Sequence, residues 1–290
     1  MQGAGLDRAL PYFLLAPSLL LVLAVFVYPV YDGVRASLHF YRFGRALDFV
    51  GLDNYRRVLG DERFRDSLLV TLKFVFLAVS IETVLGLALA LLCARELPFI
   101  RVVRAMLIVP MIVTPVVVGI VFRLIYASDV GLLTAANQAI GGEQVQILSR
   151  ETSAFLGLVA LDVWEWTPLM FLILLAGIQS LPVEPFEAAR VDGAGAWRVF
   201  LDHTLPMLRP VLAVAVVLRT IDAFTTFDQV FVLTRGGPGT ATQLISIYGY
   251  NTAFKFQQVG FAAAMLFMVA LVVLALAFVA VRLIRRSIAE

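Results

Sequence analysis

Uninterrupted apolar runs of membrane length dominate this sequence. No charged residue occurs between Leu10 and Tyr31 or between Val259 and Val281. About 20 apolar residues in a helix cross the ~30 Å hydrocarbon core of a bilayer, so each run is long enough to span it. Charged residues make up only 15% of the chain, against roughly 25% in soluble domains. Together, these features predict an integral membrane protein.

The apolar runs predict an all-α chain with six transmembrane helices in one domain, residues 1–290. Only helices and closed barrels satisfy the backbone hydrogen bonds in lipid, and these runs are too long and too uniformly apolar for barrel strands. We place the spans at about 11–33, 68–93, 104–126, 153–179, 207–233 and 258–283. A polar loop, residues 180–206, separates the fourth span from the fifth.

Several classes of function lack their sequence signals. A net charge of +2 gives no case for nucleic-acid binding. The single cysteine, Cys93, cannot form an internal disulfide, and His39 and His203 have no ligand-like neighbours, so we expect no metal. Without paired histidines or a nucleophile elbow we name no catalytic residue and expect no enzyme. The only lysines, Lys73 and Lys255, follow no glycine-rich phosphate cradle. Any ATP that drives this chain must therefore be hydrolysed on another chain, and we expect no cofactor here.

The first half of the polar loop predicts a short helix that ends in a sharp bend. Pro185 and Glu187 suit a helix start, because proline fits the first turn and a carboxylate favours the positive end of the helix dipole. Ala188, Ala189 and Arg190 are strong helix formers. Gly193 suits the left-handed position at which helices end.

The second half of the loop predicts another short helix with one apolar face. Trp197 and Phe200 are three residues apart and share that face, and we expect Pro206 to end the helix. Two interpretations of the loop are open from composition alone. It is either an amphipathic connector that rests on lipid headgroups or a rigid surface with aromatic anchors for a protein partner.

The order of the loop residues resembles the EAA loop of bacterial ABC importer permeases. The landmarks that carry this resemblance are Glu187-Ala-Ala, Asp192-Gly-Ala, Phe200, Leu205-Pro and Pro210. The resemblance implies a type I importer permease fold in which this loop is cytoplasmic and docks as a coupling helix in a groove of an ATPase subunit. The positions to which it assigns ATPase coupling are Glu187, Ala188, Ala189, Asp192, Gly193, Ala194, Trp197, Phe200 and Pro206.

Charged residues occur at membrane depth in two spans. Asp162, Glu165 and Trp166 share one face of the fourth span, and Arg219 and Asp222 share a face of the fifth. Each such charge costs about 2.5–3.5 kcal/mol on insertion scales, so the group should face the protein interior or a water-filled path.

We leave two readings of these charges open. One is a structural ion pair of Arg219 with Asp222, Asp162 or Glu165. The other is a translocation path for a polyhydroxylated ligand, whose hydroxyls need acceptors and whose C–H faces stack on aromatic rings. The path candidates are Asp162, Glu165, Trp166, Arg219, Asp222, Phe227 and Asp228.

Further motifs extend the resemblance over most of the chain. They are Trp164-Glu-Trp-Thr-Pro168, Arg219-Thr-Ile-Asp-Ala-Phe224, Phe227-Asp228, Thr234-Arg-Gly-Gly-Pro238 and Gly260-Phe-Ala-Ala-Ala264. They are similar to the maltose-permease-like type, which handles sugars, polyols and glycerol phosphates. This resemblance implies a bacterial inner-membrane complex with a second related permease, two ATPase subunits that hold ATP and magnesium, and an extracytoplasmic binding protein.

Orientation does not follow from the basic residues, because lysines and arginines divide equally between the two sides of the predicted topology. The resemblance places the EAA loop, and with it both termini, in the cytoplasm. A self-powered secondary transporter is the alternative, and it would favour an internal repeat with unwound half-helices. An integral-membrane enzyme is a third class, for which the sequence offers no catalytic signal.

Overall fold

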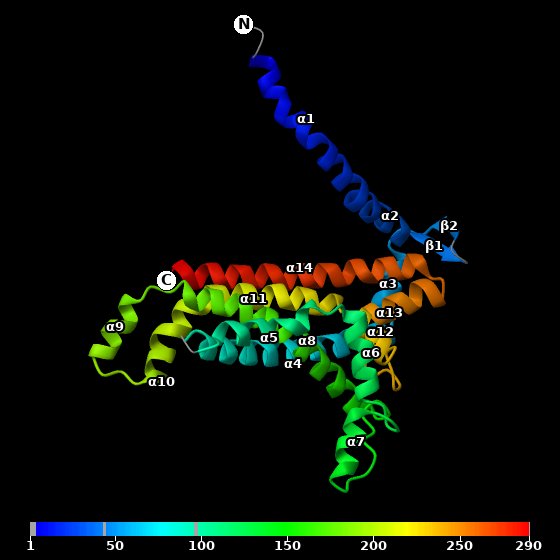
Figure 1. The fold of residues 1–290 in the computed structure, drawn as a ribbon. Coiled ribbons are helices and arrows are strands. Elements are labelled where there is room, and N and C mark those ends of the chain that lie inside the picture. Colours follow the sequence, from blue (N-terminus) through cyan, green and yellow to red (C-terminus); the bar gives the residue numbers. More distant parts are fainter. Residues whose placement is uncertain (1–3, 43–44, 96–97, 290) are drawn as a thin grey trace. The chain divides into compact units, whose positions relative to one another are not determined.

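The structure, a computed structural model, describes residues 4–42, 45–95 and 98–289, and it is mostly helical (Figure 1). Its α-helices are α1 (Ala4–Val22), α2 (Tyr28–Ser37), α3 (Asp53–Gly60), α4 (Glu62–Cys93), α5 (Ile100–Ile112), α6 (Pro115–Ile125), α7 (Leu132–Ala139), α8 (Glu151–Gln179), α9 (Glu184–Val191), α10 (Ala196–Val199), α11 (Leu205–Thr225), α12 (Asp228–Leu233), α13 (Ile245–Tyr250) and α14 (Val259–Ala289). Three π-helical turns are η1 (Leu23–Val27), η2 (Phe200–Thr204) and η3 (Asn251–Lys255). Strands β1 (His39–Arg42) and β2 (Arg45–Phe49) form an antiparallel hairpin, which the all-α prediction did not include.

The chain divides into two compact units. The first comprises Met1–Glu62 and Gly249–Ala270. Within it, the buried Asn54 amide on α3 donates hydrogen bonds to the carbonyl oxygens of Ser37 (2.9 Å) and His39 (3.0 Å) and so ties α3 to the start of the hairpin. Gly260 on α14 approaches the same hairpin closely, because a Cβ there would collide with the His39 carbonyl oxygen.

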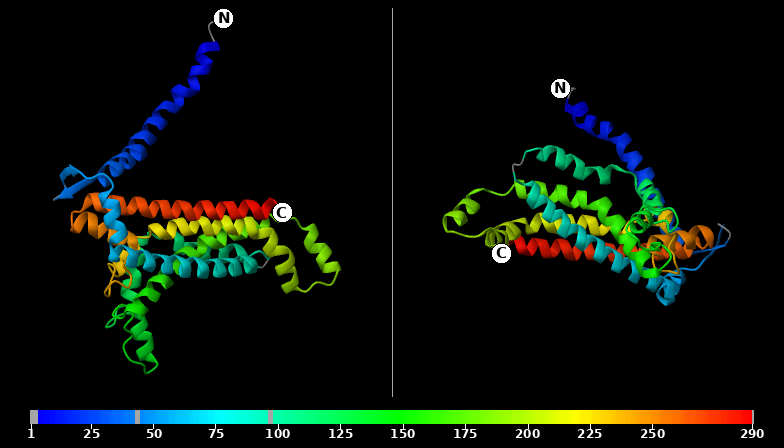
Figure 2. Two further views of the ribbon diagram at one scale, coloured as in Figure 1. Left: turned by 180° about the vertical axis from the view of Figure 1, so that it is seen from behind. Right: turned by 60° about the horizontal axis from the view of Figure 1, so that its bottom comes forward.

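The second unit comprises Arg63–Tyr248 and Leu271–Glu290. In this unit α4, α5, α8 and α11 lie side by side, with α9 and α10 at one end and α6, α7 and α12 at the other (Figures 1 and 2). Its core gathers buried side chains from three of the long helices, namely Ala90, Cys93, Phe171, Leu174, Leu175 and Leu208. Helix α8 is the centre of this arrangement, since α5, α6 and α11 all contact it.

Two glycines let the long helices of this unit approach closely. A Cβ on Gly86 of α4 would lie 2.7 Å from Met170 Cβ on α8. A Cβ on Gly177 of α8 would lie 2.8 Å from side-chain atoms of Leu208 and Val211 on α11. Small residues at helix contacts are typical of membrane bundles, where packing rather than the hydrophobic effect holds helices together.

Among the described residues, five helical segments are long and apolar enough to cross a membrane. They are Phe13–Ser37, Glu62–Cys93, Glu151–Gln179, Ala196–Thr225 and Val259–Val279. A sixth candidate is the pair α5 and α6, which meet at 94° and correspond to the span predicted at 104–126. The bend follows from Pro115. Proline keeps the preceding Thr114 extended, with ψ at 139°, and then starts α6.

The span predicted at 207–233 is also interrupted. Helix α11 ends at Thr225, Thr226 leaves the helical region with ψ at 120°, and α12 starts at Asp228. Helix α12 then packs against α6. Gly119 permits this contact, because a Cβ there would lie 3.1 Å from the backbone of Gln229.

Candidate functional site: a bent polar loop and a buried charge network

The first helix of the polar loop ends in a hydrogen-bonded bend at Gly193. Helix α9 begins at Glu184 with Pro185 in its first turn, as its sequence predicts. Gly193 has φ at +75°, the left-handed conformation that only glycine adopts at little cost. Its N–H donates to the Arg190 carbonyl (3.1 Å), and the Ala194 N–H donates to the Ala189 carbonyl (2.9 Å). These two bonds form a Schellman motif, so the predicted bend is confirmed and is rigid.

The second helix of the loop does not end at Pro206, and that prediction is wrong. The chain remains helical from Ala196 to Thr225. The turn before the proline widens into η2, in which the Leu205 N–H donates to the Phe200 carbonyl five residues earlier. A proline removes one donor from a helix, and a π-turn is one way to accommodate the change in the hydrogen-bond ladder. The loop is therefore continuous with the membrane helix α11.

Large apolar side chains of the loop are exposed. Val191 is 88% exposed and Trp197 is 72% exposed, although both are large and apolar. The rings of Trp197 and Phe200 lie 5.5 Å apart, which confirms that they share one face. Trp197 and Phe200 also line a groove of about 600 Å³ with Arg95, at the end of α4, and Arg190. Such a surface suits a protein partner better than bulk water.

The other predicted loop positions differ in exposure. Ala189 is buried, whereas Glu187, Ala188 and Asp192 are exposed. The small, buried Ala189 therefore faces inward while the charged residues of α9 face outward.

The charges at membrane depth converge on Arg219 of α11. Its guanidinium donates to Glu82 on α4 through Nε (2.8 Å) and Nη2 (3.2 Å), to Asp162 on α8 through Nη2, and to Asp222 through Nη1 (2.8 Å). Gln229 of α12 donates to the other oxygen of Asp162 (3.2 Å). Arg219, Glu82 and Asp162 are fully buried, and Asp222 is 47% exposed. One guanidinium thus links three membrane helices.

Sequence reasoning missed Glu82 as a member of this network. In the sequence, Glu82 is a carboxylate at membrane depth in the second span. The same signal singles out Asp162 and Glu165, so it could have identified Glu82 as well. Two of the pairs expected for Arg219, with Asp162 and with Asp222, are present. The expected alternative pair with Glu165 does not form. Glu165 is buried, and no described residue forms a hydrogen bond with its Oε2.

The remaining path candidates are Trp166, Phe227 and Asp228. The Arg219 guanidinium carbon lies 5.1 Å from the centre of the Trp166 ring. Phe227 is half-buried and stacks on Phe231 with ring centres 5.3 Å apart, and Asp228 is exposed at the start of α12. Within the described ranges, no group of three His, Cys, Asp or Glu side chains could hold a metal ion.

Comparison with known proteins gives consistent matches over most of the chain. The family model described as "Binding-protein-dependent transport system inner membrane component" matches residues 82–289. The trehalose/maltose transport system permease protein MalF of Thermococcus litoralis is 42% identical over 246 residues, which cover 84% of this chain and 83% of that protein. The trehalose transport system permease protein SugA of Mycobacterium tuberculosis is 36% identical and covers 96% of this chain and 89% of its own length.

A solved structure has the same fold. It is that of a bacterial alginate ABC transporter in complex with an alginate pentasaccharide-bound periplasmic protein. One of its chains matches with a TM-score of 0.84 and 22% identity, covering 97% of this chain and 96% of that chain. The fold is thus that of a type I importer permease.

Proposed function

Because the chain belongs to the family of binding-protein-dependent transport system inner membrane components, we propose that it forms half of the path by which an ATP-driven importer carries a sugar or related polyol. The chain is a multi-pass membrane protein and a transport subunit rather than a catalytic one. The carbohydrates named for its relatives, trehalose and maltose, support the substrate class.

The observation that carries the proposal is the exposed, rigidly bent loop that continues directly into a membrane helix. A force applied to α10 reaches α11 directly, because Ala196–Thr225 is one helix, and α9 joins α10 through the hydrogen-bonded bend at Gly193. Helix α11 holds Arg219, so movement of the loop acts on the buried charge network. In this proposal the ATPase-coupling surface consists of Glu187, Ala188, Ala189, Asp192, Gly193, Ala194, Trp197, Phe200 and Pro206.

The substrate path follows the exposed edge of the charge network. Asp222, Phe227 and Asp228 offer acceptors and an aromatic face to a polyhydroxylated ligand. The path also includes Asp162, Glu165, Trp166 and Arg219, of which Arg219 bonds to both Asp222 and Asp162. A second related permease supplies the other half of the path, and an extracytoplasmic binding protein delivers the ligand. ATP and magnesium belong to two separate ATPase subunits, which meet the loop in the cytoplasm. Both termini of the chain are then cytoplasmic.

Reconstitution tests this proposal directly. The chain is placed in proteoliposomes alone and with the second permease, the ATPases and the binding protein, and uptake of labelled trehalose and maltose is measured with and without ATP. We expect uptake only in the full complex with ATP. Uptake by the chain alone without ATP would overturn the proposal in favour of a secondary transporter.

Two loop variants test the coupling role within the full complex. Gly193→Asp and Glu187→Lys should both insert and fold, yet lose ATP-driven uptake. Wild-type ATPase association and wild-type uptake in both variants would contradict the coupling role.

A further inference from the structure

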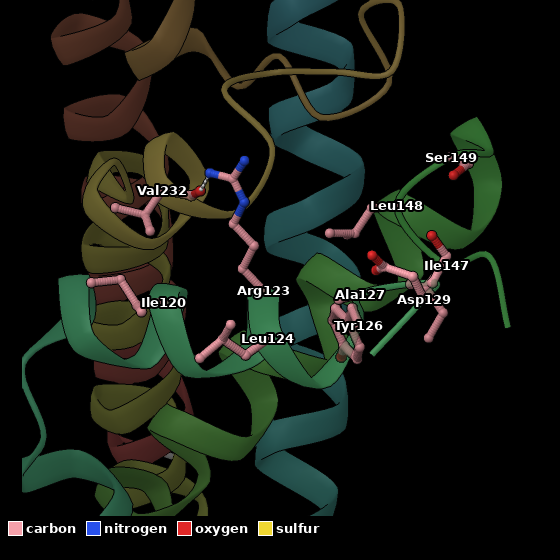
Figure 3. Close-up of a pocket in the computed structure, with 11 residues that line it drawn as sticks. Ile120, Arg123, Leu124, Tyr126, Ala127, Asp129, Ile147, Leu148, Ser149 and Val232 are labelled. Carbon is pink, nitrogen blue, oxygen red and sulfur yellow. Dashed lines mark hydrogen bonds between the residues drawn. The ribbon is translucent and has the colours of Figure 1, made fainter. Parts of the chain in front are cut away.

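A cavity of about 420 Å³ opens at the end of the second unit that lies opposite the polar loop (Figures 1 and 3). Helix α8 separates the two sites, since it starts just after the cavity residue Ser149 and ends just before the loop. Its 29 residues span about 44 Å at 1.5 Å per residue. The cavity and the loop are therefore on opposite faces of the membrane.

The walls of this cavity are held by internal hydrogen bonds. The Tyr126 hydroxyl donates to the Gly157 carbonyl on α8 (3.1 Å). The Ala127 carbonyl accepts the Gly131 N–H (3.0 Å), which fixes the turn that carries Asp129. The Ser153 hydroxyl donates to the Ile147 carbonyl (2.6 Å) and fixes the opposite wall. Ligand sites in proteins are usually preformed in this way, at about 300–1,000 Å³.

Gly157 brings the two walls together. A Cβ at this position would lie 2.9 Å from Ile147 Cγ2 and 3.1 Å from Tyr126 Cε2. Any larger residue would push Tyr126 or Ile147 away from α8, so the cavity depends on a glycine at this place.

The polar groups of the cavity carry both signs of charge. Figure 3 shows Arg123 on one side and Asp129 and Ser149 on the other. Arg123 donates one Nη1 bond to the Val232 carbonyl (3.2 Å), which leaves further guanidinium donors for a ligand. The Asp129 carboxylate has neither an ion pair nor a hydrogen bond in the part of the chain that the structure describes. Apolar atoms of Leu124, Tyr126 and Val232 line the remainder.

We infer that this cavity is an entry site that binds a neutral, polyhydroxylated sugar on the extracytoplasmic face of the chain. An anion would meet the Asp129 carboxylate and a cation the Arg123 guanidinium, whereas sugar hydroxyls both donate and accept. The apolar wall suits the C–H faces of a sugar ring. This inference rests on the proposed function for the side of the membrane and for the sugar class, and it adds a site distinct from the charge network around Arg219.

Cysteine protection in the full complex tests the site without relying on transport by the variants. Ser149→Cys is alkylated in the complex without ATP, with and without trehalose, and the modification of this chain is measured by mass spectrometry. Val130→Cys is the matched control, because Val130 is 80% exposed next to the cavity and does not line it. The native Cys93 is 4% exposed, so the wild-type chain serves as the blank.

Trehalose at ten times its Kd for the cavity should slow alkylation at position 149 about tenfold. The alkylation rate at position 130 should not change. Combining Asp129→Ala with Ser149→Cys should raise the trehalose concentration that gives half-maximal protection about tenfold. This factor corresponds to a loss of about 1.4 kcal/mol of binding free energy, as expected for one hydrogen bond to a charged group. Asp129→Asn should recover part of this loss. Glu143→Ala, an exposed carboxylate of the same segment outside the cavity, should have no effect.

The outcomes separate this inference from the proposed function. If the wild-type complex takes up trehalose but position 149 shows no protection even at trehalose concentrations far above those that saturate uptake, the entry site is overturned and the importer role stands. Equal protection in the Asp129→Ala and wild-type chains would also overturn the site. A complex that takes up neither trehalose nor maltose overturns the proposed function, and this result is known before any variant is labelled.

Discussion

Replacing Arg219 with methionine should destabilise the membrane bundle more than any other single charge removal in the described structure. Among the ion pairs that the described residues form, Arg219 supplies the only cation that contacts the buried Glu82 and Asp162. Methionine is similar in length but leaves both carboxylates without a partner. Removing one member of a buried ion pair costs about 3–5 kcal/mol, because the remaining charge stays buried without compensation.

This loss of unfolding free energy corresponds to a lower melting temperature, Tm. For chains approaching this size, each kcal/mol lowers Tm by about 2–4 °C, so Arg219→Met should unfold about 6–20 °C earlier than the wild-type chain in detergent. The Tm of Arg219→Lys should lie between those of Arg219→Met and the wild-type chain. One ammonium group cannot reproduce a guanidinium that bonds to Glu82, Asp162 and Asp222 together. Combining Arg219→Met with Glu82→Gln and Asp162→Asn should recover part of the loss by removing the unpaired charges.

The assay is the midpoint of thermal unfolding, with Arg209→Met as the matched control. Arg209 lies on the same helix and is exposed, so its loss should change stability by no more than about 0.5 kcal/mol. An Arg219→Met midpoint equal to that of Arg209→Met would refute the stabilising role of Arg219 in the charge network. A triple variant that is less stable than Arg219→Met would also refute it.

Three further predictions concern the loop and the helix contacts. Gly193→Val should lower ATP-driven uptake, because a left-handed residue with a Cβ costs about 1–2 kcal/mol or more, while Gly195→Ala (φ −67°) should transport normally. A Gly193→Val complex with full uptake would argue against the rigid bend. Trp197→Ala should weaken ATPase association about tenfold or more in a pull-down, as expected for an aromatic anchor, and unchanged association would exclude it as an anchor. Gly86→Ala should cost about 1–3 kcal/mol, because its Cβ would overlap Met170; Gly60→Ala, with open space around it, is the control in the same thermal assay.

The sequence predicts the membrane helices and the bend at Gly193, because both depend on local chemistry. Apolar length fixes a span, and glycine fixes a left-handed bend, whatever the rest of the chain does. The prolines were harder to interpret. Pro110 lies inside α5, Pro115 starts a helix at 94° to it, and Pro206 lies in a helix that continues. Whether a proline breaks, starts or only distorts a helix depends on the packing around it, which no local signal reports.

The charge network also could be predicted only in part, because its members are far apart in the sequence. A charge at membrane depth indicates that a residue faces the protein interior, and on that ground Asp162, Arg219 and Asp222 were candidates. Their third-helix partner, Glu82, is 137 residues from Arg219 in sequence. The pairing of Arg219 with Glu82 rather than with Glu165 depends on how α4, α8 and α11 pack, and the sequence alone does not report that packing. The roles of these residues in a substrate path stay predictions.

The side of the membrane on which Val191 lies tests the central claim most directly. Val191→Cys, at a position 88% exposed on the loop, is treated with a membrane-impermeant maleimide in intact cells and in inverted vesicles, with Val130→Cys as the matched variant at the opposite end of the second unit. We predict that the Val191→Cys thiol reacts only in inverted vesicles, and more slowly when the ATPase subunits are bound, while the Val130→Cys thiol reacts in intact cells. Labelling of the Val191→Cys chain from outside the cell would contradict the coupling role of the loop and the orientation of the chain together.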